Sequence, residues 1–573
     1  MERFPVVIAG AGPVGLTLAL ELEHQGVQTL LIERNHTTTT HPKMDITNGR
    51  SMELFRRLGV AERLRAIAIP GDRDMVVSWV TSLDGWELTR FAYPGVDQSR
   101  EQTRIRNDGR GSLEPSMRVS QILLEPALKS FLENESRFIT VQYGVGLESF
   151  TQHADGVDVV LKDSSTGEFR TVRADYLAGC DGAGSAVRRG LGIGLDSVDL
   201  RKLVAKELGP RRMVGMLARS WAWDRERPAS GDFYMVHFTS RDRAAFQKHG
   251  PVWHTQSPRG WTLISQNDED SWTLHSPLGV GQDAAAIDPR EFVFKTLGRR
   301  FDCTVLEANA WTPRLTVADG YGAGRVWLAG DAVHQVPPTG GYGMNTGVGD
   351  AIGLGWALAA NVAGWGTPAL LEDYERERRA VALRNRDAAG RHAVLRLAIK
   401  SQYHPAIHQE GWDGPRQRRR LGREIADLGN LENEADGIEW GYCYQSPSVA
   451  NEPGTIPEQT WDAYRPTTRP GSRPPSVYLA DGRAIFDLFG TGFTLLRFTD
   501  VDVTGMVEEA ESRCVPVEVV DISDEHIRRL YERDLVLIRP DQHVAWRGNV
   551  LPETPGELID QIRGASPKSA TRG

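Results

Sequence analysis

Residues 4–33 read FPVVIAGAGPVGLTLALELEHQGVQTLLIE, and they contain the clearest secondary-structure pattern of the chain. The apolar run at 4–9 ends at a glycine-rich turn, which suits a strand buried in a parallel sheet. Apolar residues then recur at helical spacing over 14–24, and a second apolar run over 28–32 closes on an acid. We therefore expect a strand, a turn, a helix and a second parallel strand, which is the beginning of a Rossmann-type α/β domain.

The turn of this unit has the sequence GAGPVG. Gly10 permits the sharp turn out of the strand, Gly12 lets backbone amides approach a pyrophosphate, and Gly15 allows helix and strand to pack closely. Glu33, at the end of the second strand, is placed to bind a ribose. The alternative is an ordinary glycine-rich turn, and the motif alone does not separate NAD from FAD. The residues that we expect at the dinucleotide are Gly10, Gly12, Pro13, Val14, Gly15, Glu33 and Arg34.

A second glycine-rich motif, at 330–345, follows an apolar strand at 325–329. An acid at a strand end, here Asp331, can bind a ribityl hydroxyl, and the backbone amides of the loop after it can face a planar ring. A helix that starts near Asn345 would point its positive end at that ring, which favours a reduced, anionic flavin. We interpret this motif as an FAD site rather than a loop that joins a strand to a core helix. The FAD contacts expected here are Asp331, Pro338, Gly340, Gly341, Gly343, Met344 and Asn345.

The third motif is CDGAGSAVR at 180–188, which alone would indicate an Asp-Gly turn before a helix. Together with GAGPVG and GDAVHQVPPTGGYGMNTGVGDA, in this order, it resembles the FAD-dependent aromatic hydroxylases of the para-hydroxybenzoate hydroxylase and phenol hydroxylase type. The resemblance covers residues 1 to about 400. It implies non-covalently bound FAD, with Glu33 on the adenosine ribose and Asp331 on the ribityl chain. The further FAD contacts that we expect are Lys43, Arg118, Gln121, Asp181 and Gly182.

The chain departs from the family pattern at Gly184, where relatives carry arginine or another polar residue, and at Lys43, where they commonly have arginine. The resemblance implies a monooxygenase that hydroxylates a phenolic or polyketide-like aromatic substrate with NADH or NADPH and dioxygen, through a flavin C4a-hydroperoxide. A second GxGxxG is absent from the sequence. This favours transient coenzyme binding by a single-component enzyme over reductases or Baeyer–Villiger enzymes with two such domains.

Other functions on the same scaffold are a halogenase, a lactone-forming oxygenase or a drug-inactivating hydroxylase. A halogenase would carry WxWxIP, whereas here Arg225 and Glu226 follow the nearest segment, at 221–224. A non-catalytic flavin-binding scaffold is a further alternative. The intact Asp331, Pro337 and Gly340 argue against it.

Hydroxylation is faster when the phenol loses its proton, so a general base is expected near the substrate hydroxyl. Our candidate is Asp45, because its spacing to Arg50 resembles that of the catalytic aspartate and the following arginine in phenol hydroxylase. The alternative is an aspartate that caps a loop or pairs with Arg50. His334 is the next candidate, although its place in the second motif is more typical of a structural residue. The residues expected to line the substrate pocket are Tyr234, His237 and Pro337, and the first two could instead be buried sheet residues.

With 573 residues the chain needs several domains. We expect an α/β protein in which a Rossmann-type FAD-binding domain carries an inserted β-sheet substrate domain. The C-terminal block, which contains LFGTGFTLLRF at 488–498, resembles the thioredoxin-like α/β domain appended to phenol hydroxylase relatives. The C-terminal block lacks CxxC, which favours a structural role or a homodimer contact. The expected boundaries are 1–73, 109–200 and 312–400 for the FAD-binding domain, 74–108 and 201–311 for the substrate domain, 401–475 for a helical segment and linker, and 476–563 for the thioredoxin-like domain.

The net charge of −9 argues against a general nucleic-acid binder or a protein of anionic membranes. The four cysteines are widely separated and show no zinc spacing, so we expect no metal site and a reducing cytoplasm. No apolar run reaches the length of a membrane span. We expect a cytoplasmic enzyme with a small aromatic substrate.

Overall fold

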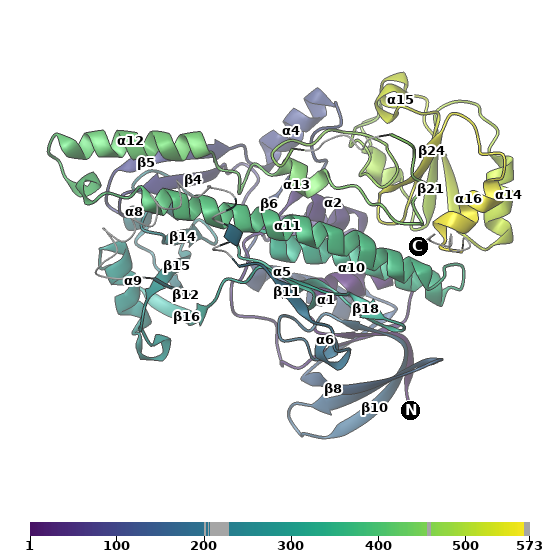
Figure 1. Cartoon of the computed structure of the whole chain (residues 1–573), viewed down its shortest axis with the longest axis horizontal. Coiled ribbons are helices and arrows are strands. Elements are labelled where there is room, and N and C mark those ends of the chain that lie inside the picture. The colour runs from purple at the N-terminus through teal and green to yellow at the C-terminus, as the bar shows by residue number, and fades with distance from the viewer. Residues whose placement is uncertain (200–201, 204–205, 207–228, 455–459, 566–573) are drawn as a thin grey trace.

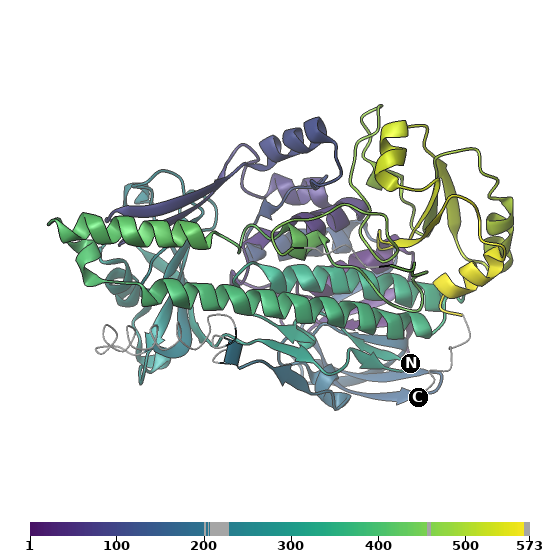
Figure 2. The ribbon, with the colours of Figure 1, turned by 45° about the horizontal axis from the view of Figure 1, so that its top comes forward.

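The computed structural model describes residues 1–199, 202–203, 206, 229–454 and 460–565. The tryptophan segment at 221–224 therefore lies outside the described residues. The long helix α11 (Ala369–Ser401) runs along the molecule from α12 (Asp413–Leu428) at one end to the C-terminal domain at the other (Figures 1 and 2). Within the described ranges, no helix has both the length and the apolar content needed to cross a bilayer.

The central sheet has the strand order β18-β19-β10-β1-β2-β7, with β9 and β8 continuing from β10. Its β1 pairs in parallel with β2 and β10, and β10 pairs in parallel with β19. Val6, Val7 and Ile8 of β1 are fully buried, as expected for a strand covered on both faces. The strands are β1 (Arg3–Ala9), β2 (Thr29–Glu33), β7 (Ile139–Tyr143), β8 (Val145–His153), β9 (Gly156–Asp163), β10 (Phe169–Gly179), β18 (Gly322–Ala323) and β19 (Val326–Leu328).

The expected strand–turn–helix–strand unit is present as β1, α1 (Pro13–His24) and β2, which confirms the Rossmann-type prediction. Because β1, β2, β10 and β19 are parallel, their carboxyl ends meet at one edge of the sheet. Gly10, Glu33, Asp181 and Asp331 each lie at or just after one of these ends. Ligands of open α/β sheets bind at this edge.

A second sheet has the order β16-β12-β15-β14-β13-β4-β5. Its strands come from two stretches of chain that are joined by the parallel pair β13 and β4. One face packs an aromatic core that includes Phe238, Phe246 and Phe301. The strands are β4 (Met75–Val80), β5 (Glu87–Tyr93), β12 (Ala229–Thr239), β13 (His254–Gln256), β14 (Thr262–Ser265), β15 (Ser271–Gly279) and β16 (Thr304–Trp311).

Arg118 lies in the short strand β6 (Met117–Arg118), which pairs with β3 (Ile46–Thr47) and precedes α5 (Gln121–Glu135). One predicted helix begins slightly earlier than expected. The helix expected near Asn345 is α10 (Tyr342–Val362). Its left-handed N-cap, Gly341, has a φ of 66°, which glycine adopts without strain.

The C-terminal domain has the succession β21-α14-β22-α15-β23-β24-α16 and the sheet order β22-β21-β23-β24. This α/β arrangement agrees with the predicted thioredoxin-like domain. Its elements are β21 (Phe493–Arg497), α14 (Thr504–Ser512), β22 (Val517–Asp521), α15 (Glu525–Tyr531), β23 (Leu535–Ile538), β24 (Val544–Gly548) and α16 (Pro555–Ile562).

Buried ion pairs join this domain to the rest of the chain. The Arg473 guanidinium donates from Nε to Glu53 Oε2 at 2.9 Å, and the Arg539 guanidinium donates from Nη2 to Glu377 Oε2 at 2.8 Å. Arg473 and Arg539 are 1% and 2% exposed. Arg473, which lies in the stretch 401–475 expected as a helical segment and linker, is therefore buried in the protein.

Candidate active site

The glycine turn after β1 leaves room for a pyrophosphate. Gly10 has a φ of 103°, and a Cβ at this residue would clash with the backbone of Cys180. A Cβ at Gly12, in contrast, would meet nothing within 4 Å. Gly12 is the N-cap of α1, and no side chain caps that helix end. Open space at an uncapped helix N-terminus suits a phosphate group.

Two carboxylates flank this turn. Glu33 accepts a hydrogen bond from the backbone N–H of Ala11 at 2.9 Å, which fixes the carboxylate beside the glycine turn. Asp181 Oδ2 accepts from the backbone N–H of Ala186 at 2.6 Å, while its buried Oδ1 has no partner among the described residues. Arg34 and Lys43 are exposed. These groups fit the polar part of a dinucleotide.

The N-terminal part of α10 packs against the turn that follows β19. No side chain caps this helix, and Asp331 is exposed nearby at the end of β19. Asn345 Oδ1 accepts from the backbone N–H of Asn48 at 2.9 Å, and its Nδ2 donates to the carbonyl of Ile46 at 3.2 Å. The loop that carries Asp45 is thereby fastened beside the helix end. Uncapped amides at this position suit the electron-accepting ring of a flavin.

Two residues predicted to approach FAD contact protein groups in the structure. The Arg118 guanidinium donates to Asp268 Oδ1 at 2.7 Å and to the carbonyl of Ser265 at 3.1 Å. Arg118 thus joins the loop region of the first sheet to the second sheet. The Gln121 side chain donates to Glu125 Oε1 at 2.7 Å.

Asp45 faces the second sheet. Its Oδ2 accepts a hydrogen bond from Trp253 Nε1 at 2.6 Å and lies 3.2 Å from His254 Nε2. Burial by itself raises the pKa of Asp45, but His254, the Trp253 N–H and the Arg118 charge outweigh burial and hold the pKa below its usual range. Asp45 is therefore an ionised carboxylate at neutral pH.

Arg50, the alternative partner of Asp45, points elsewhere. Its guanidinium donates to the carbonyl of Asp541 at 2.8 Å and to Gln542 Oε1 at 3.2 Å, both in the C-terminal domain. The pairing of Asp45 with Arg50 is thus not formed. The partners found instead, Trp253 and His254, were not among the residues predicted from the sequence.

His334, the second candidate for the base, is a buried structural residue. Its Nε2 lies 2.8 Å from Asp350 Oδ2 on α10. Arg378 of α11 donates from Nε to the other carboxylate oxygen of Asp350 at 2.8 Å. This chain of contacts fastens the second glycine motif to the two long helices, so His334 has its own partner.

The two strand residues predicted to line the pocket lie on opposite faces of the second sheet. Tyr234 packs edge-to-face against Phe292, with a centroid distance of 5.0 Å, in the aromatic core. His237, on the other face, contacts Thr273 Oγ1 through Nδ1 at 3.1 Å. Burial lowers the pKa of His237, which keeps the ring neutral. Tyr234 therefore faces the aromatic core, and His237 faces the opposite side of the sheet.

Register places further polar residues on the face of His237. Met235 pairs with His275 on one side and with Asn309 on the other, so these side chains share a face. Asn309 donates from its amide to His41 Nε2 at 2.7 Å. Burial lowers the pKa of His275 to about 4. The sequence signal that could have found this set is a polar residue at alternate positions of apolar strands.

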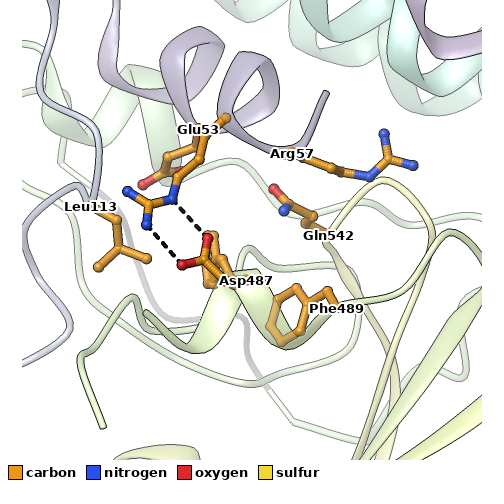
Figure 3. Close-up of a pocket in the computed structure, with 8 residues that line it drawn as sticks. Glu53, Arg57, Leu113, Asp487, Phe489 and Gln542 are labelled. Atoms are coloured by element: carbon orange, nitrogen blue, oxygen red, sulfur yellow. Dashed lines mark hydrogen bonds and ion pairs between the residues drawn. The ribbon is translucent and has the colours of Figure 1, made fainter. Parts of the chain in front are cut away.

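The cavity in Figure 3 lies elsewhere, between α2 (Gly49–Arg57) and the C-terminal domain, and has a volume of about 160 Å³. Its charged groups already have partners: Arg56 Nε donates to Asp487 Oδ1 at 2.7 Å, and Glu53 accepts from Arg473. No residue of the three glycine motifs lines it. This cavity is therefore separate from the sheet edge at which the three glycine motifs lie.

Comparison with known proteins identifies the family of the chain. Residues 3–389 match the family model described as "FAD binding domain", and residues 467–565 match "Aromatic-ring hydroxylase, C-terminal". The chain is 34% identical to the FAD-dependent monooxygenase apdD of Emericella nidulans, covering 98% of this chain and 90% of the relative. It is 28% identical to phenol 2-monooxygenase of a Pseudomonas species, with 98% and 92% covered.

Solved structures extend the likeness to the whole fold. RebC with bound 7-carboxy-K252c superposes with a TM-score of 0.84 at 34% identity, over 99% of this chain and 100% of that one. The flavin-dependent monooxygenase PieE, in complex with FAD and substrate, gives a TM-score of 0.84 at 28% identity, over 98% and 99%. The prediction of FAD from the glycine motifs is confirmed. The chain belongs to the FAD-dependent aromatic-ring hydroxylases and is an FAD-dependent monooxygenase.

Proposed function

We propose that the substrate is a phenolic or polyketide-like aromatic compound, that NADH or NADPH is the reductant, and that the substrate hydroxyl is activated at Asp45. The observation that carries the proposal is the position of Asp45. Its carboxylate lies on the loop fastened to the N-terminus of α10 and contacts Trp253 and His254 of the second sheet. A substrate bound between the two sheets would meet both the flavin site and this carboxylate.

The relatives support the substrate class. Besides phenol 2-monooxygenase, the chain is 30% identical to a putative polyketide hydroxylase of Streptomyces halstedii, covering 96% of this chain and 94% of that one. The polar face described above also suits a neutral, oxygen-bearing aromatic compound. Buried and without partners among the described residues are the polar atoms Asn309 Oδ1, Trp311 Nε1 and His275 Nδ1. Such atoms bind ligand groups favourably, because an unpaired buried polar atom is costly.

Bound FAD would supply the reducing equivalents and the activation of dioxygen, and the protein supplies position, dryness and proton transfer. Gly12 and the first turn of α1 would hold the pyrophosphate, Glu33 and Asp331 the two sugar chains, and the amides of α10 the ring. The second sheet would cover the bound substrate. The Arg118–Asp268 pair holds the two sides together.

In this proposal the ionised Asp45 takes part in activating the substrate hydroxyl. Electron density on an aromatic ring rises when a ring hydroxyl loses its proton, so a proton acceptor must contact that hydroxyl. A carboxylate fixed by two donors keeps its charge and its direction. It thereby stabilises positive charge that develops beside it when the hydroxyl proton moves.

The test is coenzyme oxidation by the purified protein with FAD. NADH and NADPH oxidation should be slow alone and should rise when phenol, 2,4-dichlorophenol or a polycyclic phenol is added, with a hydroxylated product detected by mass. A requirement for a separate reductase protein would contradict the single-component enzyme. Stimulation without any hydroxylated product from the panel would contradict the proposed substrate class.

A further inference from the structure

We infer that His254 accepts the proton of the substrate hydroxyl and that Asp45 is the positioning residue that holds it; this inference rests on the proposed function. His254 belongs to β13 and contacts the loop that carries Asp45. Its side chain is 14% exposed, against 16% for Asp45. The pair is thus largely shielded from solvent.

The hydrogen bonds determine which ring nitrogen is available. Nε2 of His254 lies 3.2 Å from Asp45 Oδ2, and an ionised carboxylate only accepts, so Nε2 carries the proton. Nδ1 is then an acceptor, and it is buried without a partner among the described residues. The Trp253 N–H, 2.6 Å from the same Oδ2, fixes the carboxylate and hence the ring. A carboxylate that orients an imidazole in this way sets its tautomer.

The chemistry also favours the imidazole. A free imidazole nitrogen is intrinsically a stronger base than a carboxylate oxygen. Asp45 has a pKa below its usual range, because its donors and Arg118 outweigh burial, and is therefore a weak acceptor. In the step inferred here the phenol O–H bond breaks and an Nδ1–H bond forms on His254. The products are a phenolate and an imidazolium whose Nε2–H still faces Asp45, and the proton later returns to solvent.

The other charged groups around His254 are paired or neutral. Arg118, whose guanidinium carbon is 5.6 Å from the centroid of the Trp253 ring, pairs with Asp268. From α11, Arg396 Nη2 donates to Glu432 Oε2 at 2.7 Å. Burial lowers the pKa of the remaining titratable neighbours on the sheet face and the facing loop, His275 and His41. Asp45 is thus the carboxylate in direct contact with the His254 ring.

Two variants distinguish a His254 ring that accepts the substrate proton from one that only holds Asp45 in place. In His254→Gln, the amide N–H₂ can reach the place of Nε2 and still donate to Asp45, but no acceptor stands at the place of Nδ1. In Asp45→Asn, the acceptor ring is present but its orientation is lost. The matched control is His153→Gln, because His153 forms a similar pair with Asp158, at 3.0 Å, on the exposed β8–β9 hairpin.

The experiment measures flavin content, product formed per coenzyme oxidised, and the absorbance of bound 4-nitrophenol across pH. We expect His254→Gln to keep FAD, to lose roughly a hundredfold in hydroxylation, and to regain part of it at high pH, where phenolate arrives already ionised. Wild type and His153→Gln should bind 4-nitrophenol as the yellow anion at a pH where His254→Gln binds it as the neutral phenol.

Two results would overturn the inference: unchanged hydroxylation in His254→Gln, or the same ionisation of bound 4-nitrophenol in wild type and His254→Gln. Either result would make Asp45 the proton acceptor instead. These outcomes differ from failure of the proposed function. If the proposed function is wrong, wild type itself gives no hydroxylated product, whereas the inference fails when wild type is active and His254→Gln is equally active.

Discussion

The indole N–H of Trp253 donates to Oδ2 of Asp45 at 2.6 Å, although the two residues are 208 positions apart in the chain. The contact joins the loop beside the flavin-binding helix to the middle of the second sheet. The Asp45 carboxylate is therefore oriented in this way only when the Asp45 loop and the second sheet are packed together. Under the proposed function, this contact would place the flavin site and the substrate site next to each other.

Replacing Asp45 by asparagine should lower hydroxylation by roughly a hundredfold or more, the usual scale for acid–base catalysis. FAD binding should persist, because the Asp45 carboxylate is not among the groups expected to hold the nucleotide. Coenzyme oxidation should yield more hydrogen peroxide, since oxygen activated in the site is then not used by the substrate. Raising the pH should partly restore product, because more substrate arrives as phenolate. Unchanged coupling of product to coenzyme at every pH would remove Asp45 from the mechanism.

Trp253→Phe should shift the pH profile without removing activity. The indole N–H is one of the groups that lower the pKa of Asp45. Without it the pKa of Asp45 rises, so the carboxylate becomes neutral at a higher pH and the acidic limb of kcat/KM moves upward. Trp272→Phe is the control, because Trp272 donates instead to the carbonyl of Ser240 at 3.3 Å. An equal shift in both variants would contradict the role of the Trp253 contact.

Gly12→Val should fold but lose FAD. A Cβ at Gly12 meets no protein atom within 4 Å, so the new side chain would occupy the space of the pyrophosphate. Gly411→Val is the matched control, because a Cβ at Gly411 is equally free of contacts, away from the glycine motifs. Flavin content after gel filtration and the far-ultraviolet circular dichroism spectrum decide the outcome. Full FAD occupancy in Gly12→Val would show that the pyrophosphate lies elsewhere.

Arg539→Gln should destabilise the whole protein. Arg539 is 2% exposed and holds the buried Glu377 of α11, so its loss leaves a buried charge without its partner. The expected loss in the free energy of unfolding is about 3–5 kcal/mol. The control Arg497→Gln removes the exposed pair with Asp521 in the same domain and should leave the midpoint of urea unfolding unchanged. Equal midpoints for both variants would show that the C-terminal domain is not anchored through Arg539.

The local parts of the fold could be predicted from the sequence. The glycine turn of β1 and the motif around Asp331 each depend on a strand, a turn and a helix that are adjacent in the chain. Backbone geometry at Gly10 and Gly341 requires φ values that glycine adopts freely, so such residues leave a visible pattern. The predicted Rossmann-type sheet and FAD site follow from these short-range signals.

The long-range contacts could not be predicted in the same way. Arg118 pairs with Asp268, and Arg50 reaches the C-terminal domain, because each partner is brought near by the packing of separate sheets. His254 has no motif around it. Strand register and the packing of the Asp45 loop bring it beside Asp45. Arg473 lies in a proline-rich stretch that suggests a linker, yet its guanidinium is buried against Glu53. Burial of a charge depends on the partner and leaves no local signal.

The most direct test of the central claim is the source of the oxygen in the product. Purified protein with bound FAD is incubated with a stimulating phenol and either NADH or NADPH under isotopically labelled dioxygen in ordinary water. The mass of the product is then measured by mass spectrometry. We predict a hydroxylated ring that carries one labelled oxygen atom, with no other protein added. Product that carries oxygen from water, or coenzyme oxidation that yields only hydrogen peroxide with every phenol, would contradict it.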